Sequence, residues 1–463
     1  MSVDILNHAQ VSLPSVPNKL PPPTKLSSFD AIWIGFPPVQ RLLLYTDTRG
    51  GTDDFSVLVD CLKSSLSSTL LDFLPLAGKL TYVPSTGDVE IDYSDPGFSF
   101  DVAESDMDLQ RLAADEVHDT ESYLKLVPSV DMSELPFWPF AVQVTLFKCG
   151  GVAIGYAAHH TVVDGKGLWQ FVEAWTATCR SAMSGKPRPE YRLPSYDRTA
   201  IKHPRSREET AREILHASSP NLPIVRSPTL NFVAGRHNLV RRTFVLDAPA
   251  IRSLKQRATQ HYNGIVHNGN GIVHNGNGNG GNATRPPSTF LAIAAHSWSC
   301  FVRAKALDPD DDTVFSFMAD CRNRLEPPVE EGYFGNCVKF MYVRALVREV
   351  TAEGGRACSK IGESIRGIGL EDPLADVDSW VADFAALPYA RTTNVSASPR
   401  FRVYETDFGF GRPDRVELVS MNHEGEVAMV GGKEEGSVQV TAALNRDQMD
   451  AYAKLFLGGL HGN

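Results

Sequence analysis

One short segment of the sequence combines residue types that could do acid–base chemistry: His160 and Asp164 are separated by three residues, and Gly165 follows. A catalytic imidazole needs a pKa near the working pH, a fixed tautomer and one ring nitrogen open to the substrate. Asp164 could orient the imidazole directly, or it could turn away and brace the loop through an arginine, while Gly165 fits a turn that a Cβ atom would obstruct. The segment makes His160 a candidate general base with Asp164 as its catalytic partner. On spacing alone, the alternative is a core histidine near a surface aspartate, because the chain has 13 histidines.

The elements on either side of this segment are expected to hold it rigidly. Residues 151–158 (GVAIGYAA) are nearly all apolar or small, which is typical of a strand buried on both faces. Residues 167–183 have apolar side chains at spacings of three and four, which predicts a helix. His160 thus lies where a buried strand passes into a helix, a common place for catalytic residues. The same patterns predict helices over 54–71, 248–258, 288–304 and 445–457, and strands over 89–93, 141–147, 243–246, 313–318 and 437–442.

Composition divides the chain into two halves. Residues 186–228 are rich in Pro, Arg and Ser and have weak periodicity, which predicts a crossover loop between an N-terminal domain (1–185) and a C-terminal domain (229–463). Residues from about 262 to 284 are dominated by a repeated Asn-Gly pattern, which predicts a disordered insertion because such runs bury little apolar surface. Three histidines in or beside it (His261, His267 and His274) are too loosely spaced to indicate a metal site.

Composition and missing motifs exclude several classes of function. The 463-residue chain has a net charge of -10 and no long basic run, so nucleic acid is not an expected partner. No run reaches the roughly 18 apolar residues of a membrane span, no secretory signal pattern opens the sequence, and the seven cysteines include no CxxC pair. We therefore expect a cytoplasmic protein without a metal site. The GxSxG, HExxH and Walker-type motifs of rival chemistries are also missing from the sequence.

Five segments resemble, in order along the chain, the motifs of the plant BAHD acyl-CoA-dependent acyltransferases. They are 75–80 (PLAGKL), 160–165 (HTVVDG), 320–324 (DCRNR), 333–337 (YFGNC) and 407–411 (DFGFG). The resemblance implies an α/β fold of two chloramphenicol-acetyltransferase-like domains with mixed sheets and an active-site channel at their interface. It also implies that His160 takes the proton of an acceptor hydroxyl, which attacks the acyl-CoA thioester without an acyl-enzyme. Acyl-CoA is then a substrate, no cofactor is needed, and the protein is expected to be a monomer.

The resemblance also implies roles for other motif residues. The motif aspartate of the family tends to turn away from the histidine and pair with an arginine; by position, Arg322 is the first candidate here and Arg324 the second. The DFGFG segment is expected to be structural, so that Asp407, Gly409 and Gly411 belong to the scaffold and not to the catalytic residues. Phe410 stands where the family has tryptophan, which puts in question any role for an indole N–H donor.

Further segments resemble one branch of the family, which acylates sugar hydroxyls of flavonoid, anthocyanin and other phenolic glucosides. These segments are 37–45 (PPVQRLLLY), 398–400 (SPR) and 404–406 (YET). Malonyl-CoA is a frequent donor in this branch and is favoured here. A malonyl group carries a free carboxylate that a cation would bind, and Lys166 is the nearest candidate in sequence, the alternative being a solvated lysine at the start of a helix.

Other functions remain open on the sequence. Within the family, the main alternative is a hydroxycinnamoyl-CoA-dependent O- or N-acyltransferase that acts on an anthocyanin glucoside or a polyamine. Outside it, the alternatives are a non-catalytic acyltransferase-like protein, which the presence of His160 and Asp164 argues against, and a Ser-His-Asp hydrolase, which the missing nucleophile elbow argues against.

Overall fold

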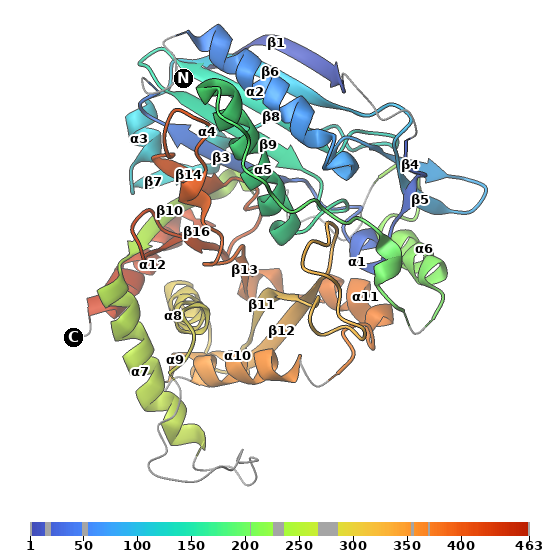
Figure 1. The fold of residues 1–463 in the computed structure, drawn as a ribbon. Coiled ribbons are helices and arrows are strands. Elements are labelled where there is room, and N and C mark those ends of the chain that lie inside the picture. The colour runs from blue at the N-terminus through green and yellow to red at the C-terminus, as the bar shows by residue number, and fades with distance from the viewer. Residues whose placement is uncertain are drawn as a thin grey trace, which may run out of the picture.

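The chain folds into two halves, each built on a mixed β-sheet (Figure 1). The computed structural model describes residues 2–13, 20–48, 54–203, 205–225, 236–266, 286–352, 356–368 and 371–461, with the side chains of 260–266 and 461 left aside. The predicted α/β class with mixed sheets is confirmed, because each large sheet contains both parallel and antiparallel neighbours. Most of the predicted insertion lies outside the described residues. Its first residues, 262–266, are helical in the structure.

A six-stranded sheet forms the first half. Its strand order is β1 (Val3–Ser12), β6 (Gly97–Ser105), β8 (Phe140–Phe147), β9 (Val152–Ala158), β3 (Val39–Tyr45) and β14 (Arg415–Leu418). A three-stranded sheet beside it has the order β2 (Thr24–Lys25), β5 (Asp88–Asp92) and β4 (Lys79–Val83). Strand β9, which precedes the histidine motif, is buried along its whole length, as its apolar sequence predicts.

Helices cover both faces of the six-stranded sheet. The pair α2 (Phe55–Leu70) and α5 (Gly165–Ser184) lies on one face (Figure 1), where the Trp175 indole donates to the Leu62 carbonyl and the Ser65 hydroxyl. The short helices α3 (Leu109–Ala113) and α4 (Thr120–Leu124) pack their apolar side chains against the other face. Helix α1 (Ser28–Ala31) packs against α6 (Arg207–Ser218). The long α5 is therefore anchored by its apolar stripe, and its first turn is held at a fixed position.

A seven-stranded sheet forms the second half. Its order is β12 (Val338–Leu346), β11 (Asp312–Asp320), β13 (Thr392–Ser396), β15 (Glu426–Gly431), β16 (Val438–Asn445), β10 (Leu239–Leu246) and β7 (Val117–Asp119). The helices of this half are α7 (Ala248–Val266), α8 (Thr289–Ala304), α9 (Val347–Thr351), α10 (Arg356–Gly367), α11 (Trp380–Ala385) and α12 (Arg446–His461). Within the described part of the chain, none of the helices is long and apolar enough to cross a membrane.

The two halves exchange strands, which a division of the sequence at 186–228 does not anticipate. Strand β7, from the first half of the sequence, pairs with β10, and β14, from near the C-terminus, pairs with β3. The stretch predicted as a crossover loop also contains the helix α6. This helix buries Ala211, Ile214, Leu215 and Ser218 at spacings of three and four residues, a helical signal that the surrounding Pro, Arg and Ser residues obscure.

Strand alternation determines which side chains of the second sheet face the first half. Along β11, Phe315 and Phe317 point into the helix-covered core, whereas Ser316 and Met318 point to the opposite face and line a pocket. Helices α8, α10 and α12 cover the core face with buried apolar side chains. The uncovered face of this sheet is thereby directed at the end of β9 and the start of α5.

Candidate active site

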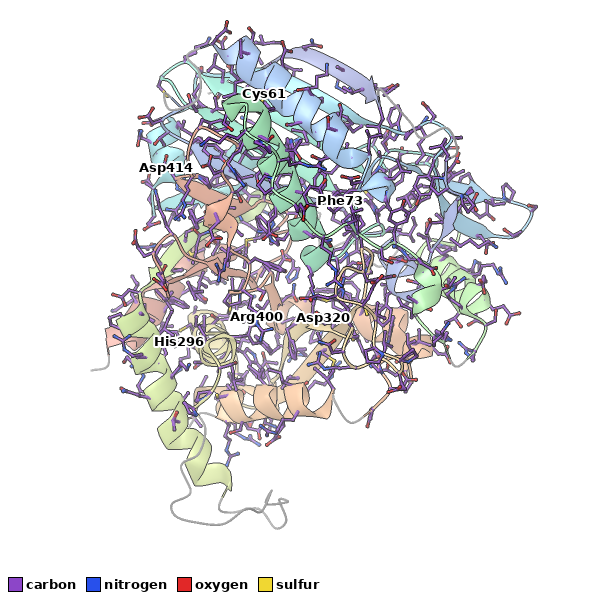
Figure 2. The ribbon with its side chains drawn as sticks, viewed as in Figure 1. Cys61, Phe73, His296, Asp320, Arg400 and Asp414 are labelled. Carbon is purple, nitrogen blue, oxygen red and sulfur yellow. The ribbon has the colours of Figure 1, made fainter. Side chains whose placement is uncertain are left out.

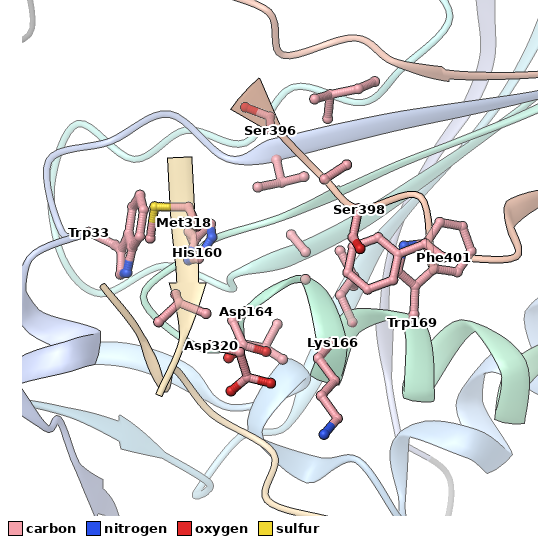
Figure 3. A pocket seen from close by; sticks show the side chains of 18 of the residues that line it. Trp33, His160, Asp164, Lys166, Trp169, Met318, Asp320, Ser396, Ser398 and Phe401 are labelled. Carbon is pink, nitrogen blue, oxygen red and sulfur yellow. The ribbon is translucent and has the colours of Figure 1, made fainter. Parts of the chain in front are cut away.

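A pocket of about 880 Å³ lies between the two halves, a volume in the range of small-molecule sites. The first half lines it with residues of the 33–41 and 158–174 segments, and the second half with residues of β11, β12, β13 and the 397–401 segment. Figure 2 shows two lining residues, Asp320 and Arg400, at the level where the halves meet. In the close-up of Figure 3, His160 lies between Trp33 at one end and Trp169 at the other.

The two adjacent histidines have different environments. His159 is completely buried, its Nδ1 accepts a hydrogen bond from the backbone N–H of Thr161 at 3.2 Å, and burial lowers its pKa to about 3. The imidazole of His160 stacks on the indole of Trp33, with ring centroids 3.7 Å apart and ring planes at 22°. Nδ1 of His160 is buried, whereas Nε2 is the nitrogen left accessible from the pocket. Of these two histidines, His160 is the one placed to exchange a proton with a bound molecule.

Burial sets the protonation state of His160. The low polarity around the ring lowers its pKa below the ordinary value of 6.5, an effect that the nearby charge of Asp164 and the Asn336 carboxamide oppose in part. A histidine with a lowered pKa is neutral at pH 7 and has a free lone pair. Such a group can accept a proton from a hydroxyl, which is the task of a general base.

The pH dependence of turnover is expected to report this histidine. Protonated His160 cannot accept a proton, so kcat/KM should fall as the pH drops through the pKa of the free enzyme, with a midpoint below 6.5. Initial rates measured from pH 4.5 to 9 would check this, with protein stability recorded over the same range as a control. An acid limb centred above pH 7 would contradict the assignment.

Asp164 does not orient the imidazole by a hydrogen bond. Its Oδ2 lies 2.8 Å from Nη1 of Arg322 and accepts from the backbone N–H of Cys337 at 3.1 Å. Its Oδ1 accepts from Nη2 of Arg322 and, as the N-cap of α5, from the backbone N–H of Gly167, both at 3.1 Å. Burial alone raises the pKa of this carboxyl, but the guanidinium and the two N–H donors outweigh burial and keep the group ionised. Asp164 is therefore a positioning residue that fixes the loop behind His160.

Of the two candidate arginines, Arg322 is the partner of Asp164, as expected. Arg322 is 1 % exposed, and its Nη2 also donates to the backbone carbonyls of Tyr333 and Gly335. Arg324 is exposed, and its guanidinium contacts the backbone carbonyl of Asp320 instead. The DCRNR segment of the second half thus reaches across the interface with one arginine and leaves the other in solvent.

A second buried network holds the same loop; the sequence patterns did not single out its members Asp30 and Arg198, and they marked Asn336 only as part of the YFGNC segment. The Asn336 side-chain amide donates to the backbone carbonyl of His160 at 2.7 Å and to Oδ1 of Asp30 at 2.8 Å. Nε of Arg198 pairs with Oδ2 of Asp30 at 3.0 Å, and its Nη2 donates to the carbonyl of Val162 at 2.8 Å. Two buried arginine–aspartate pairs therefore brace the histidine loop, and the YFGNC segment contributes to both.

The glycines of the loop are restricted by packing. Gly165 is the first residue of α5, where an added Cβ would lie 3.3 Å from the Phe401 ring. The tighter position is Gly167, where a Cβ would lie 2.5 Å from Cγ2 of Val163. The steric requirement for glycine at position 165 is thus moderate, and the requirement at position 167 is stronger.

The DFGFG segment has a structural geometry. Oδ1 of Asp407 accepts hydrogen bonds from the backbone N–H groups of Gly409 and Gly411, at 2.7 and 3.0 Å. Both glycines have a positive φ, +116° and +110°, which side chains disfavour. The Phe410 ring is buried against Tyr45, with centroids 4.8 Å apart, and 407–411 are not among the described residues that line the pocket. The tryptophan-to-phenylalanine difference therefore changes core packing at a distance from the pocket.

Lys166 lies at the rim of the pocket. It is exposed in the first turn of α5, and in Figure 3 its side chain points away from His160. Within the described ranges, no group of three or more His, Cys, Asp or Glu side chains is placed to hold a metal ion. His267 and His274, and the side chain of His261, lie outside the described residues.

Three kinds of comparison with known proteins each match nearly the whole chain. The model of the Transferase family matches residues 2–456. The chain is 31% identical over 452 residues to phenolic glucoside malonyltransferase 2 of Arabidopsis thaliana, covering 96% of this chain and 94% of that protein. It is 30% identical over 484 residues to malonyl-CoA:anthocyanidin 5-O-glucoside-6''-O-malonyltransferase of Arabidopsis thaliana, covering 99% and 98%. The structure is similar to the crystal structure of vinorine synthase, with a TM-score of 0.74, 20% identity, and 99% and 98% of the two chains covered.

Proposed function

The chain belongs to the Transferase family of BAHD acyl-CoA-dependent acyltransferases, and from this premise we propose that it transfers a malonyl group from malonyl-CoA to a sugar hydroxyl of a phenolic or flavonoid glucoside. The observation that carries the proposal is the accessible Nε2 of His160 in a pocket between the halves. The similarity to two malonyltransferases over nearly their whole lengths supports the choice of donor and acceptor.

The reaction follows from the position of His160. Its Nε2 takes the proton of the acceptor hydroxyl, and the oxygen attacks the thioester carbonyl of malonyl-CoA to form a tetrahedral oxyanion. The oxyanion collapses, the C–S bond breaks, and the thiolate of CoA leaves and recovers the proton from the imidazolium. General-base catalysis of this kind contributes about 10²–10⁴-fold. The buried pairs of Arg322 with Asp164 and of Arg198 with Asp30 hold the ring where the proton must be taken.

The pocket lining suits a glucoside. One group of lining side chains is polar and can hydrogen-bond to sugar hydroxyls: Ser316, Asn394, Ser396, Ser420 and Asn422. Another group is aromatic and can stack on a phenolic ring: Trp33, Phe36, Phe340, Phe384 and Tyr389. His160 lies in the same pocket as both groups, so a bound glucoside can present a sugar hydroxyl to Nε2.

The proposal also covers the oligomeric state, the location and the cofactor requirement of the protein. We propose a monomer that acts in the cytoplasm, without nucleic acid or membrane as partner, and that needs no metal or prosthetic group because acyl-CoA is a substrate. The odd number of cysteines, seven without a CxxC pair, is typical of a reducing compartment.

A donor and acceptor panel tests the proposal. The purified protein is incubated with malonyl-CoA or coumaroyl-CoA and with phenolic glucosides, flavonoid glucosides or polyamines, while free thiol and product mass are followed. We expect one thiol for each malonylated glucoside formed. If only coumaroyl-CoA gave product, the assignment of malonyl-CoA as the donor would be wrong, while the acyl-transfer reaction would stand. Acceptance of polyamines in place of glucosides would overturn the acceptor.

A further inference from the structure

Arg41 is a buried cation at the pocket, and the described part of the chain offers it no acidic partner. It lies on β3, is 4 % exposed, and is one of the residues that line the pocket. Among the described residues, no carboxylate pairs with its guanidinium, and its Nε is buried without a hydrogen bond. The described carboxylate whose charge acts on it, Glu417, is already shared by Arg241 and Arg415. An unpaired buried guanidinium is costly, because its charge loses hydration without gaining a counter-ion.

The other buried arginines show that a buried guanidinium without a carboxylate partner is unusual within the described part of the protein. Five arginines of the described chain are 5 % exposed or less. Four of them face carboxylates: Arg198 faces Asp30, Arg322 faces Asp164, and Arg241 and Arg415 face Glu417. Arg41 differs in that, among the described residues, it has no ion pair, and its guanidinium lies over the Trp169 ring, whose centroid is 5.3 Å from Cζ. Burial lowers the pKa of Arg41, but a guanidinium remains charged at neutral pH.

We propose that Arg41 binds the free carboxylate of the malonyl group and makes the site selective for an anionic acyl donor. The inference rests on the proposed function and deepens it, since it names the side chain that recognises the acyl group. The guanidinium fork matches a carboxylate bidentately, and the bound donor would supply the counter-ion that the chain itself does not.

The strand register places Arg41 on the strand beside the one that leads into His160. On β3 and β9, Val39 pairs with Ala158 and Arg41 pairs with Tyr156, so Arg41 lies two residues along β3 from the level at which β9 leads into His160. Two residues of strand span about 7 Å, and His160 lies a further two residues beyond Ala158. In a malonyl thioester, one methylene separates the carboxylate from the carbonyl that is attacked, so the cation that binds it must belong to the pocket that contains His160. Arg41 meets this condition, whereas Lys166 is exposed and points away from His160.

Comparing two donors that differ only in the carboxylate tests the inference. Dissociation constants for malonyl-CoA and acetyl-CoA are measured without acceptor, for the wild-type protein, Arg41→Met and Arg41→Lys. A charge-assisted bidentate contact corresponds to about 10- to 100-fold in affinity. We expect Arg41→Met to raise the dissociation constant of malonyl-CoA by about this factor and to leave that of acetyl-CoA within about 3-fold of the wild-type value. Arg41→Lys should have an intermediate effect on malonyl-CoA binding, because lysine keeps the charge but lacks the guanidinium fork.

The outcomes separate the inference from the proposed function. Retained acetyl-CoA binding shows that a variant is folded. An equal effect of Arg41→Met on both donors would overturn the inference, and so would a malonyl-specific loss in Lys166→Met that is absent from Arg41→Met. A wild-type protein that transfers coumaroyl groups and no malonyl groups would overturn the proposed function instead.

Discussion

Replacing His160 by alanine is expected to lower kcat by about 10²–10⁴-fold, because the variant loses the group that takes the acceptor proton. Binding of acyl-CoA and the melting temperature should change little, since among the described residues the main contact of the His160 ring is the stack on Trp33, and its buried Nδ1 has no hydrogen-bond partner. Steady-state kinetics at saturating donor and acceptor, together with thermal unfolding, measure both quantities.

The neighbouring histidine provides a matched control. His159→Asn keeps an acceptor where Nδ1 receives the Thr161 N–H, and it removes an imidazole that is buried away from the pocket. We expect this variant to lose stability while its kcat stays within several-fold of the wild-type value. If His159→Asn abolished turnover and His160→Ala did not, the two histidines would have to exchange roles.

Arg322→Met is expected to destabilise the protein by about 3–5 kcal/mol, because it leaves the carboxylate of Asp164 buried without its counter-ion. The backbone donors of Gly167 and Cys337 would remain, but they satisfy only part of the charge. Since Asp164 caps α5 directly behind His160, kcat should fall as well. Chemical denaturation measures the first effect, and kinetics at a temperature where the variant is folded measures the second.

Arg324→Met serves as the control for this prediction. Arg324 belongs to the same DCRNR segment but is exposed, so its replacement should change the unfolding free energy by no more than about 0.5 kcal/mol. Adding Asp164→Asn to Arg322→Met removes the orphaned charge and should restore part of the lost stability. If Arg322→Met and Arg324→Met had equal effects, the buried pair would not be what holds the loop.

The catalytic loop could be predicted from sequence because its signals are local. The apolar run of β9, the spacing of α5 and the HxxxD pattern all lie within about 30 consecutive residues, and each has its own period or motif. The pairing of Asp164 with Arg322 followed from a resemblance over the whole chain, since nothing local connects residues 158 positions apart.

The supporting network could not be predicted in this way. Asp30, Arg198 and Asn336 come from three distant segments; Asp30 and Arg198 look like ordinary surface residues in sequence, and the YFGNC segment marks Asn336 without indicating its partners. The role of Arg41 could not be predicted either, for a different reason. Its charge is visible within the apolar run of β3, but the lack of a partner can be recognised only when its neighbours are placed in space. The exchange of β7 and β14 between the sheets likewise depends on long-range pairing, which short-range periodicity does not encode.

Whether His160 acts as a base on the acceptor or as a nucleophile is tested most directly by mixing the enzyme with malonyl-CoA in the absence of acceptor. Free thiol and the intact mass of the protein are followed over many turnover times, and a phenolic glucoside is then added. The account predicts no thiol burst and no acylated protein before the addition, and one thiol per malonylated product after it. A burst of one thiol per enzyme with a malonyl adduct on the protein, lost when the glucoside is added, would contradict it.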